Sequence, residues 1–430
     1  MSEPLAYLKP ETFKVDGLRR EDFEIMAPAG SRECLMAAVR AGANSVYFGV
    51  GELNMRAHSA NDFTVDDLPE LAKTLHEHNV KAYLTVNTVL YDEDLPAMRH
   101  LIEAAKAANV DAVIVSDPAA MMHAKTVGIP AHLSTQLNVG NVETLRLYSQ
   151  WADVTVLARE LRLDQVRKIY EAIQNEPICG PSGKPIRIEM FCHGALCMSH
   201  SGRCFMSLHT RGKSANRGAC LQNCRRSYIV KDKERDIELE IDNEYIMSPK
   251  DLKTIGFMDK MVAAGVRVFK IEGRARSPEY VLATVTAYRE ALETILAGQW
   301  NQEAKTHWDG ELAKVFNRGF WDGYYLGQTV GELTEDYGSG ATEKKTFLGM
   351  CLNWYSGPKI GYVHIQAGTI KVGDKILVTG PTTGAYITTV SQLRDDDQNP
   401  IEEGQKGQRV TFPVAEKIRT NDKVYKLTER

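Results

Sequence analysis

The sequence predicts an α/β fold: a (β/α)8-type barrel with a cysteine-rich loop insertion, followed by a small antiparallel β-barrel. Short apolar runs alternate with amphipathic helices from residue 23 to about residue 300, and this alternation is typical of parallel sheets. Glycines and five of the eight cysteines gather in one stretch that has no helical or strand periodicity. After about residue 344 the chain changes to short alternating strands separated by turn residues.

The candidate barrel strands are rich in Val, Ile, Tyr and Phe, as strands buried on both faces are. Three helix-turn-strand units, AAVRAGANSVYFG, AAKAANVDAVIVS and MVAAGVRVFKIEG, resemble one another, which favours a repeated αβ unit and a closed barrel. An open doubly wound sheet is the alternative, although no GxGxxG motif opens the first unit. The candidate strands span residues 23–27, 45–49, 81–86, 112–115, 131–134, 154–157, 187–191 and 266–271.

The helices between these strands carry start and stop signals. Ser31 precedes the run ECLMAAVRAG, which ends at Gly42, and a capping box at 64–67 precedes LPELAKTLHEHN. Ser277 and Pro278 open a helix that we expect to reach Gly298, because proline is favoured at the first helical position.

The composition, 43% hydrophobic and 25% charged over 430 residues, is that of a soluble globular protein. The first residues contain no secretory signal, and no window reaches the roughly 18 apolar residues of a membrane span. We therefore expect a cytoplasmic protein without membrane contact. Because the formal net charge is −4, contact with nucleic acid would depend on a local basic patch.

The changes in composition divide the chain into four segments. In the third of them, residues 317–320 are either a packed connector or a substrate lid. The turns of the last segment, with the string VGDKILVTGP, resemble the second domain of elongation factor Tu-type translation factors and hint at an RNA partner. The segments are an N-terminal extension at 1–22, the barrel at 23–300 with its cysteine-rich loop at 192–226, an aromatic connector at 301–343 and the C-terminal β-barrel at 344–430.

Four cysteines of the loop form the strongest chemical signal. Cys197, Cys204, Cys220 and Cys224 have six, fifteen and three residues between successive members. Packing of free thiols does not suit a Gly/Ser-rich loop, and cytosolic thiols stay reduced, which leaves metal ligation. Zinc sites usually show two close cysteine pairs, whereas an iron–sulfur cluster tolerates uneven spacing; the spacing favours a cluster over zinc.

Polar residues follow the candidate strands at their carboxyl ends, where barrels carry their active sites. Several arginines on one rim suit a carboxylate or a phosphate through bidentate pairing. His193 is either a substrate-orienting residue or a hydrogen-bonded loop histidine. The candidate catalytic residues are His193, Arg159, Glu160 and Glu272, and the candidate substrate-binding residues are Asn54, Arg56, Gln136, Asn138, Lys270, Arg274 and Arg276.

The cysteine-rich loop also contains a cluster of basic residues. Such a cluster is either the solvated rim of a loop or a contact for RNA phosphates. Its members are Arg203, Arg211, Lys213, Arg217, Arg225 and Arg226.

At the cysteine-rich loop the sequence resembles a known family. EMFCHGALCMSHSGRCFMS and the following NRGACLQNCR are similar to the signature of the collagenase-like U-class peptidase family 32. The resemblance extends to APAGS, YFGVGELNMRA, LSTQLNVGN, LARELRL and FKIEGRARSPEYV, and so covers nearly all of residues 23–330. Length and the appended β-barrel are most similar to the tRNA hydroxylation branch of this family.

The resemblance implies hydroxylation of the wobble uridine of certain tRNAs to 5-hydroxyuridine, with prephenate as cosubstrate, an iron–sulfur cluster (4Fe–4S) and an unidentified electron donor. The family's cluster ligands carry over onto Cys197, Cys204 and Cys220, and Cys224 is the expected fourth. Cys192 replaces an apolar residue common in relatives, so we expect it either to lie behind the ligands or to take no part.

Two other functions remain open on the sequence. A peptidase would need a nucleophile with a base, such as Cys192 with His193 or His200, and no HExxH zinc motif is present. An RNA-binding module with structural zinc would suit the C-terminal barrel, but it would leave the arginine-rich rim without a role.

Overall fold

The computed structural model describes residues 17–58, 63–229, 245–335 and 338–430. Most of the N-terminal extension expected at 1–22 lies outside the described residues, and Arg20–Asp22 form a short 3-10 turn before the first strand. No described helix is both long and apolar enough to cross a membrane.

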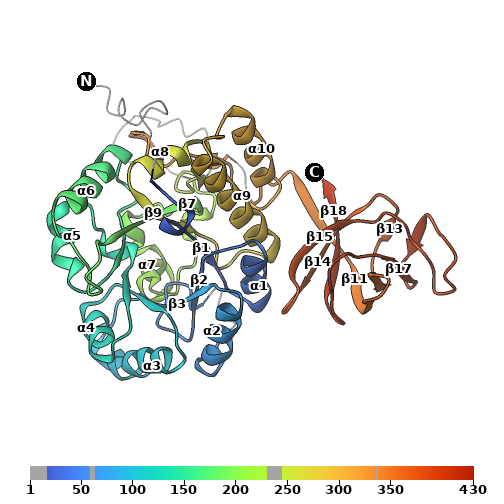
Figure 1. Ribbon diagram of the computed structural model, residues 1–430, viewed down its shortest axis with the longest axis horizontal. Helices are drawn as coiled ribbons and strands as arrows, with labels where there is room; N and C mark the ends of the chain where they lie inside the picture. Colours follow the sequence, from blue (N-terminus) through green and yellow to red (C-terminus); the bar gives the residue numbers. More distant parts are fainter. Residues whose placement is uncertain (1–16, 59–62, 230–244, 336–337) are drawn as a thin grey trace.

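Eight parallel strands form a closed barrel, as predicted (Figure 1). Consecutive strands pair in parallel, β7 pairs with β9, and β9 pairs with β1 to close the ring. All eight predicted strands are confirmed with small shifts at their ends; β7 continues to Gly194 instead of ending at residue 191. The strands are β1 (Glu24–Pro28), β2 (Ser45–Gly49), β3 (Lys81–Val86), β4 (Ala112–Val115), β5 (Ala131–Leu133), β6 (Val154–Val156), β7 (Arg187–Gly194) and β9 (Val266–Ile271).

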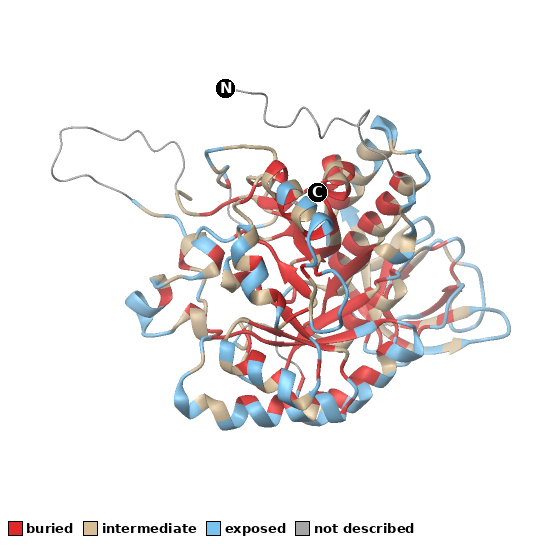
Figure 2. Ribbon diagram, turned by 60° about the vertical axis from the view of Figure 1, so that its left-hand side comes forward, coloured by how far each residue is buried: buried red, intermediate tan, exposed pale blue. Residues whose placement is uncertain are grey.

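Helices surround the barrel and begin at the predicted caps. The Ser31 side chain accepts a hydrogen bond from the Cys34 amide at 3.3 Å, and Pro278 occupies the first turn of its helix. Buried residues concentrate in the strands and on the inner faces of the helices (Figure 2). The outer helices are α1 (Arg32–Arg40), α2 (Leu68–Glu77), α3 (Leu95–Ala107), α4 (Pro118–Val127), α5 (Val142–Ser149), α6 (Leu163–Asn175), α8 (Met258–Ala263), α9 (Pro278–Leu296) and α10 (Gln302–Ala313).

Two short strands that the sequence did not predict extend the barrel wall beside β7. Strand β8 (Asp251–Lys253) pairs antiparallel with the end of β7, and β10 (Phe320–Trp321) pairs parallel with β8. The connector is packed here: the Tyr325 hydroxyl donates to the Phe191 carbonyl at 2.9 Å and the Trp321 indole donates to the Lys250 carbonyl at 3.1 Å.

The C-terminal segment is antiparallel β-structure around its own apolar core. The strands make a six-stranded sheet, in the order β15-β14-β18-β11-β12-β17, and a two-stranded ribbon of β13 and β16. Their bounds are β11 (Glu343–Tyr355), β12 (Ile360–Ile365), β13 (Thr369–Lys371), β14 (Lys375–Gly380), β15 (Gly384–Thr389), β16 (Glu403–Gln405), β17 (Arg409–Pro413) and β18 (Lys423–Glu429).

The β14–β15 hairpin packs against α1 of the barrel. Gly384 has φ +71°, and a Cβ there would lie 2.6 Å from the Ala37 backbone nitrogen, so only glycine allows this approach. Arg40 Nε donates to the Thr383 carbonyl at 3.0 Å, and Lys345 pairs with Glu279 on α9 at 2.7 Å. Leu377 of the hairpin belongs to the hydrophobic core of the barrel.

Candidate active site

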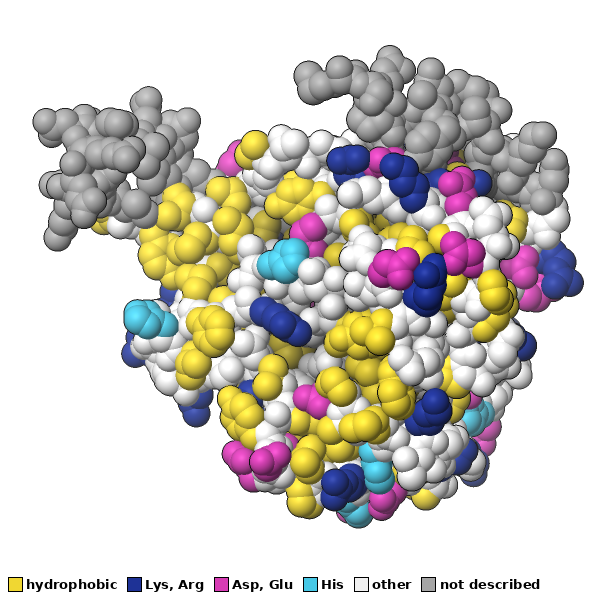
Figure 3. All heavy atoms as spheres, turned by 90° about the vertical axis from the view of Figure 1, so that its left-hand side faces the viewer, with side chains coloured by type: hydrophobic (Ala, Val, Ile, Leu, Met, Phe, Trp, Pro, Cys, Tyr) yellow, Lys and Arg dark blue, Asp and Glu magenta, His cyan; other side chains and the backbone are white. Residues whose placement is uncertain are grey.

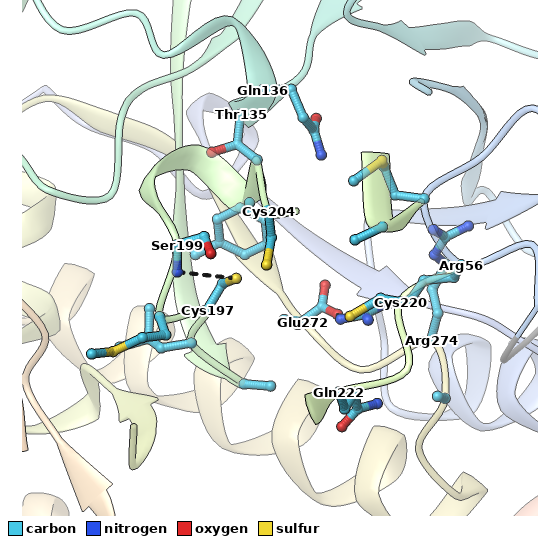
Figure 4. Close-up of a pocket in the computed structure, with 18 of the residues that line it drawn as sticks. Arg56, Thr135, Gln136, Cys197, Ser199, Cys204, Cys220, Gln222, Glu272 and Arg274 are labelled. Atoms are coloured by element: carbon cyan, nitrogen blue, oxygen red, sulfur yellow. Dashed lines mark hydrogen bonds and ion pairs between the residues drawn. The ribbon is translucent and has the colours of Figure 1, made fainter. Parts of the chain in front are cut away.

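A cavity of about 280 Å³ lies at the carboxyl ends of the barrel strands. Its floor comes from the strands and the segments that follow them, and its outer wall comes from the cysteine-rich loop. In Figure 4, Glu272 lies near the middle of this space, with Arg56 and Arg274 on its right, Gln136 above it and the labelled cysteines on both sides. One cavity therefore brings together the two groups of residues that the sequence singled out separately.

Glu272 and Arg56 form an ion pair in the cavity wall. Arg56 Nη2 lies 2.8 Å from Glu272 Oε1, and the Tyr47 hydroxyl lies 3.2 Å from Oε2. Burial raises the pKa of Glu272, but the charges of Arg56, Arg274 and Arg159 outweigh burial and leave the pKa below its ordinary value. Glu272 is therefore a carboxylate with arginines around it.

Gly194 fixes the cysteine-rich loop beside this pair. It has φ +104°, and a Cβ at this position would lie 2.3 Å from the Glu272 carbonyl oxygen. Because only glycine tolerates both the conformation and the contact, the loop begins immediately against the backbone of Glu272.

Arg274 is buried below the rim. Its Nη1 donates to Asn54 Oδ1 at 2.9 Å and to Thr85 Oγ1 at 3.0 Å, and burial lowers its pKa to about 10. Asn54 does not line the cavity; it accepts from Arg274 and from the Arg56 amide, at 3.1 Å, and so positions both arginines.

Lys270 lies at the base of the cavity, between aromatic rings. Its Nζ donates a hydrogen bond to Glu189 Oε1 at 2.7 Å. The same Nζ lies 4.6 Å from the centre of the Tyr47 ring and 5.7 Å from the centre of the Phe191 ring. Glu189 is fully buried, and burial raises its pKa although Lys270 opposes that shift.

Three further predicted residues line the cavity. The Arg159 guanidinium lies 5.6 Å from the Phe191 ring centre, and its buried Nε has no hydrogen-bond partner in the structure. Arg276 stacks on Phe316 at 3.8 Å and lies 3.6 Å from Asp251. Gln136 completes the set of cavity residues that the sequence predicted.

Two predicted residues hold the loop from behind instead of facing the cavity. Glu160 accepts from the Ser201 amide at 3.2 Å, and Asn138 accepts from the Ser201 hydroxyl at 2.6 Å. Neither lines the cavity. Both position the cysteine-rich loop over the barrel.

The placement of His193 differs from the expectation of a catalytic residue. It is 1% exposed, lies outside the cavity lining, and packs among the rings of Tyr280, Tyr288 and Phe320. Burial, with the charges of Lys253 and Arg276, lowers its pKa to about 3. The physical reason is a register shift in β7 between residues 191 and 193, which turns this side chain away from the cavity.

The four cysteines Cys197, Cys204, Cys220 and Cys224 all line the cavity. Cys197 Sγ accepts from the Ser199 amide and Cys204 Sγ from the Met206 amide, each at 3.4 Å. Burial raises the pKa of the Cys224 thiol, and the charges of the other three cysteines raise it further. The four thiols are therefore close enough to interact electrostatically. Figure 4 shows Cys197, Cys204 and Cys220 with their sulfurs turned into the same space.

These cysteines fit an iron–sulfur cluster by the chemistry of the donor set: four thiols on one cavity, two of them already receiving amide hydrogen bonds. Within the described residues, no group of three or more His, Cys, Asp or Glu is arranged to hold a single metal ion. Cys192 is buried behind the wall, where its thiol donates to the Lys270 carbonyl.

The predicted basic cluster divides into two groups. Arg217 is paired with Asp94 through two hydrogen bonds and stacks on Tyr91, and Arg225 binds the Leu196 carbonyl at 2.6 Å and the Ser248 hydroxyl at 3.0 Å. These two arginines hold the loop together through partners within the chain, and their contact with RNA stays a prediction. The exposed members are Arg203, Arg211, Lys213 and Arg226.

Residues 192–226 contain six basic and no acidic residues, so the loop is strongly positive in a chain of net charge −4. Phe205 and Met198, 70% and 52% exposed, lie among these charges. The face of the barrel turned away from the C-terminal domain instead shows basic and acidic side chains interspersed (Figure 3).

Sequence reasoning missed Tyr47, Phe191, Glu189 and Arg318. The first two and Arg318 line the cavity, and Glu189 lies beneath it. The available signal was the charge at Glu189 inside an otherwise apolar strand, since buried charges need partners. Nothing in the sequence distinguished Tyr47 or Phe191 from core aromatics.

Comparison with known proteins agrees with this architecture. The model of peptidase family U32 matches residues 30–335. A protein of Porphyromonas gingivalis named "Collagenase" is 57% identical over 409 residues, which cover 95% of this chain and 99% of that protein.

Two RNA-related proteins are also similar. The "tRNA hydroxylation protein P1" of Bacillus subtilis is 32% identical over 406 residues, 92% of each chain. A 23S rRNA 5-hydroxycytidine synthase of Escherichia coli is 32% identical over 335 residues, which cover 76% of this chain and 48% of that protein. The collagenase-named protein is the most similar of the three. With a family model matched over most of the barrel and relatives aligned over nearly their whole length, the chain belongs to peptidase family U32.

Proposed function

We propose that this protein is a cytoplasmic RNA-modifying enzyme that hydroxylates the wobble uridine of tRNA to 5-hydroxyuridine, with prephenate as cosubstrate. The observation that carries the proposal is the single cavity shared by four cysteines and a cluster of arginines. The tRNA and rRNA hydroxylation proteins among its relatives support the reaction class.

Cys197, Cys204, Cys220 and Cys224 would hold a 4Fe–4S cluster. When bound, such a cluster supplies one-electron chemistry, and an external electron donor would serve it. The amide groups of Ser199 and Met206 donate to two of these sulfurs, and hydrogen bonds to sulfur tune the reduction potential of a cluster.

Arg56, Arg159 and Arg274 would bind the carboxylates of prephenate. Guanidinium groups pair with carboxylates through two parallel hydrogen bonds, and pairing is stronger where water is excluded. Glu272 holds Arg56 in place at 2.8 Å and, as an ionised carboxylate, is the candidate general base of the cavity.

The exposed basic residues Arg203, Arg211, Lys213 and Arg226 would contact phosphates of the tRNA anticodon loop. Phosphate contacts position RNA, and unstacked bases of single-stranded loops stack on exposed aromatic rings, a role that suits Phe205. The absence of acidic residues between 192 and 226 favours this contact.

Peptide hydrolysis is the second candidate, because the relative at 57% identity is named a collagenase. The dyad of Cys192 and His193 does not suit it: both side chains are buried, neither lines the cavity, and the pKa of His193 is lowered to about 3. A nucleophilic mechanism would then need a different residue, such as one of the four cysteines that line the cavity.

The decisive experiment combines metal content with RNA analysis. We would purify the protein anaerobically and measure iron, acid-labile sulfide and the visible spectrum, for the wild type, the Cys197→Ala/Cys204→Ala variant and a Cys179→Ala control outside the cavity. We expect equal iron and sulfide in the wild type and control, and loss of both in the double variant.

The same three proteins would be expressed in a strain that lacks the gene, and its tRNA nucleosides measured by mass spectrometry. Wild type and control should restore 5-hydroxyuridine, and the double variant should not. Cleavage of gelatin by the wild type with unchanged tRNA would overturn the proposal in favour of the peptidase.

A further inference from the structure

The base of the cavity contains a lysine and a glutamate that the hydroxylation proposal leaves unused. Lys270 is the one lysine among the residues that line the cavity, and it is 5% exposed. Its Nζ donates to Glu189 Oε1 at 2.7 Å, while Glu189 Oε2 is buried without any hydrogen-bond partner in the structure. An unsatisfied buried carboxylate oxygen carries a free-energy penalty, so its position requires an explanation.

We propose that Lys270 is a catalytic residue that forms an imine with the carbonyl carbon of a bound 2-oxo carboxylate. This inference rests on the proposed function for the identity of the ligand, since prephenate carries a 2-oxo acid side chain. The side chains of the cavity favour one ligand class: the arginines suit a carboxylate, and the lysine amine suits a neighbouring ketone.

The carboxylate half of this ligand would bind the arginines next to Lys270. Arg274 and Lys270 both lie over the Tyr47 ring, at 5.9 and 4.6 Å from its centre. Arg159 and Lys270 both approach the Phe191 ring, at 5.6 and 5.7 Å. Two cations thus flank the amine across shared aromatic rings, and a carboxylate bound between them would present its neighbouring carbonyl carbon to Lys270.

A lysine amine that has given up its proton attacks carbonyl groups, so the step needs a proton acceptor beside Lys270. Glu189 is the proton acceptor at hydrogen-bond distance, and burial raises its pKa, so this carboxyl group can hold the proton that Lys270 gives up.

The step conserves atoms and electrons. Glu189 takes a proton from Lys270, and the free amine adds to the ketone carbon to give a carbinolamine. The proton returns to the hydroxyl group, which leaves as water while the C=N bond replaces the C=O bond. No oxidant or reductant takes part. The protonated imine then draws electrons from the adjacent carbons of the bound acid more strongly than the ketone did.

The test is reductive trapping on the complete, anaerobically purified protein. Phenylpyruvate, a simple 2-oxo acid, would be added with cyanoborohydride, and intact mass and peptide mapping would locate the adduct. We expect a mass increase equal to that of the acid less one oxygen atom, on Lys270. Phenyllactate, which keeps the carboxylate but has no ketone, should compete with the labelling.

Two matched variants sharpen the test. Lys270→Arg keeps the charge and a partner for Glu189, and should lose the adduct. Lys253→Arg replaces a lysine that pairs with Asp309 outside the cavity lining, and should be labelled like the wild type. Glu189→Gln should slow labelling at least tenfold while Lys270 remains in place.

Absence of a borohydride-dependent adduct on Lys270, or equal labelling of the Lys270→Arg variant, would overturn the imine. The experiment uses no RNA, so it separates this inference from the proposed function. An adduct without tRNA hydroxylation would keep the lysine chemistry and reject the RNA reaction. Hydroxylation of tRNA by a protein that gives no adduct would keep the RNA reaction and reject the lysine chemistry.

Discussion

The interior of the barrel and the interior of the C-terminal domain are built from different residues. The C-terminal domain is built around an apolar cluster that includes Val363, Ile376 and Phe412, and Asp422 is the one charged side chain buried among residues 343–430. The barrel interior instead buries Glu24, Glu189, Lys270 and His132 among its tyrosines and aliphatic residues. An apolar core needs no exact partners, whereas each buried charge depends on specific neighbours. Substitutions in the barrel interior should therefore be tolerated less well than substitutions in the C-terminal core.

The largest expected difference comes from removing one member of a buried ion pair. Glu189→Ala leaves Lys270 with no carboxylate at 2.7 Å and should lower the free energy of unfolding by about 3–5 kcal/mol. The double variant Glu189→Leu/Lys270→Met should recover most of that loss, because apolar residues of similar volume often replace a buried pair without cost. Urea denaturation measures both; equal destabilisation of the two variants would contradict the account.

The second largest difference is expected in how the stability of the two regions depends on pH. Burial lowers the pKa of His132 to about 3, so its neutral form stabilises the folded state near neutral pH. As the pH falls from about 6.5 to about 3, the unfolded chain takes up this proton first and the barrel loses stability, on the order of 5 kcal/mol in total.

Glu24 adds to the loss of barrel stability at acidic pH. Burial raises its pKa, but Lys81 and Arg187 outweigh burial and lower the pKa to about 2, so its contribution is present above about pH 4.3 and disappears below it. In the C-terminal domain, burial raises the pKa of Asp422, and protonation there favours the folded state.

Hydrogen exchange, corrected for the intrinsic effect of pH, should therefore show protection falling in β3–β5 between pH 7 and 4 while β11–β18 stay protected. His132→Phe should flatten the dependence above pH 4. Parallel loss in both regions would contradict the contrast.

Truncating the apolar core should have a smaller effect and leave activity unchanged. Ile376→Val deletes one buried methyl group and should cost about 0.5–1.5 kcal/mol, because the remaining core fills part of the space. Thermal unfolding and tRNA hydroxylation rates would be measured together. A fall in the rate at a temperature where the variant is fully folded would show that the C-terminal core takes part in the reaction.

The smallest effect on stability is expected at the mouth of the cavity. Arg203→Gln alters an exposed side chain, so unfolding should change by less than about 0.5 kcal/mol while affinity for tRNA falls and the salt dependence weakens by about one charge. Lys406→Gln, an exposed lysine of the C-terminal domain, is the matched control. Equal losses of affinity in both variants would move the RNA contact to the C-terminal domain. Filter binding at several salt concentrations measures these affinities.

The barrel was predictable because its strands are apolar runs that alternate with helices, and these helices carry sequence-local caps. Strands β8 and β10 were not, since Asp251–Lys253 carries two charged residues instead of an apolar run and both strands form by pairing with β7 and with each other. The cysteines were found by spacing alone. Arg217 and Arg225 could not be separated from Arg203, because the partners that neutralise or bury them come from distant segments of the chain. The orientation of His193 away from the cavity depends on a register shift in β7, which the residue types of this strand do not predict.

The contact at Gly384 has a consequence for how this protein can be divided in the laboratory. Leu377 and Ala385 belong to the same hydrophobic core as α1, so cutting the chain before residue 343 would uncover apolar surface on the barrel. An isolated barrel should expose this apolar surface to solvent and aggregate during expression. Anyone seeking a minimal catalytic fragment would have to redesign the outer face of α1 first.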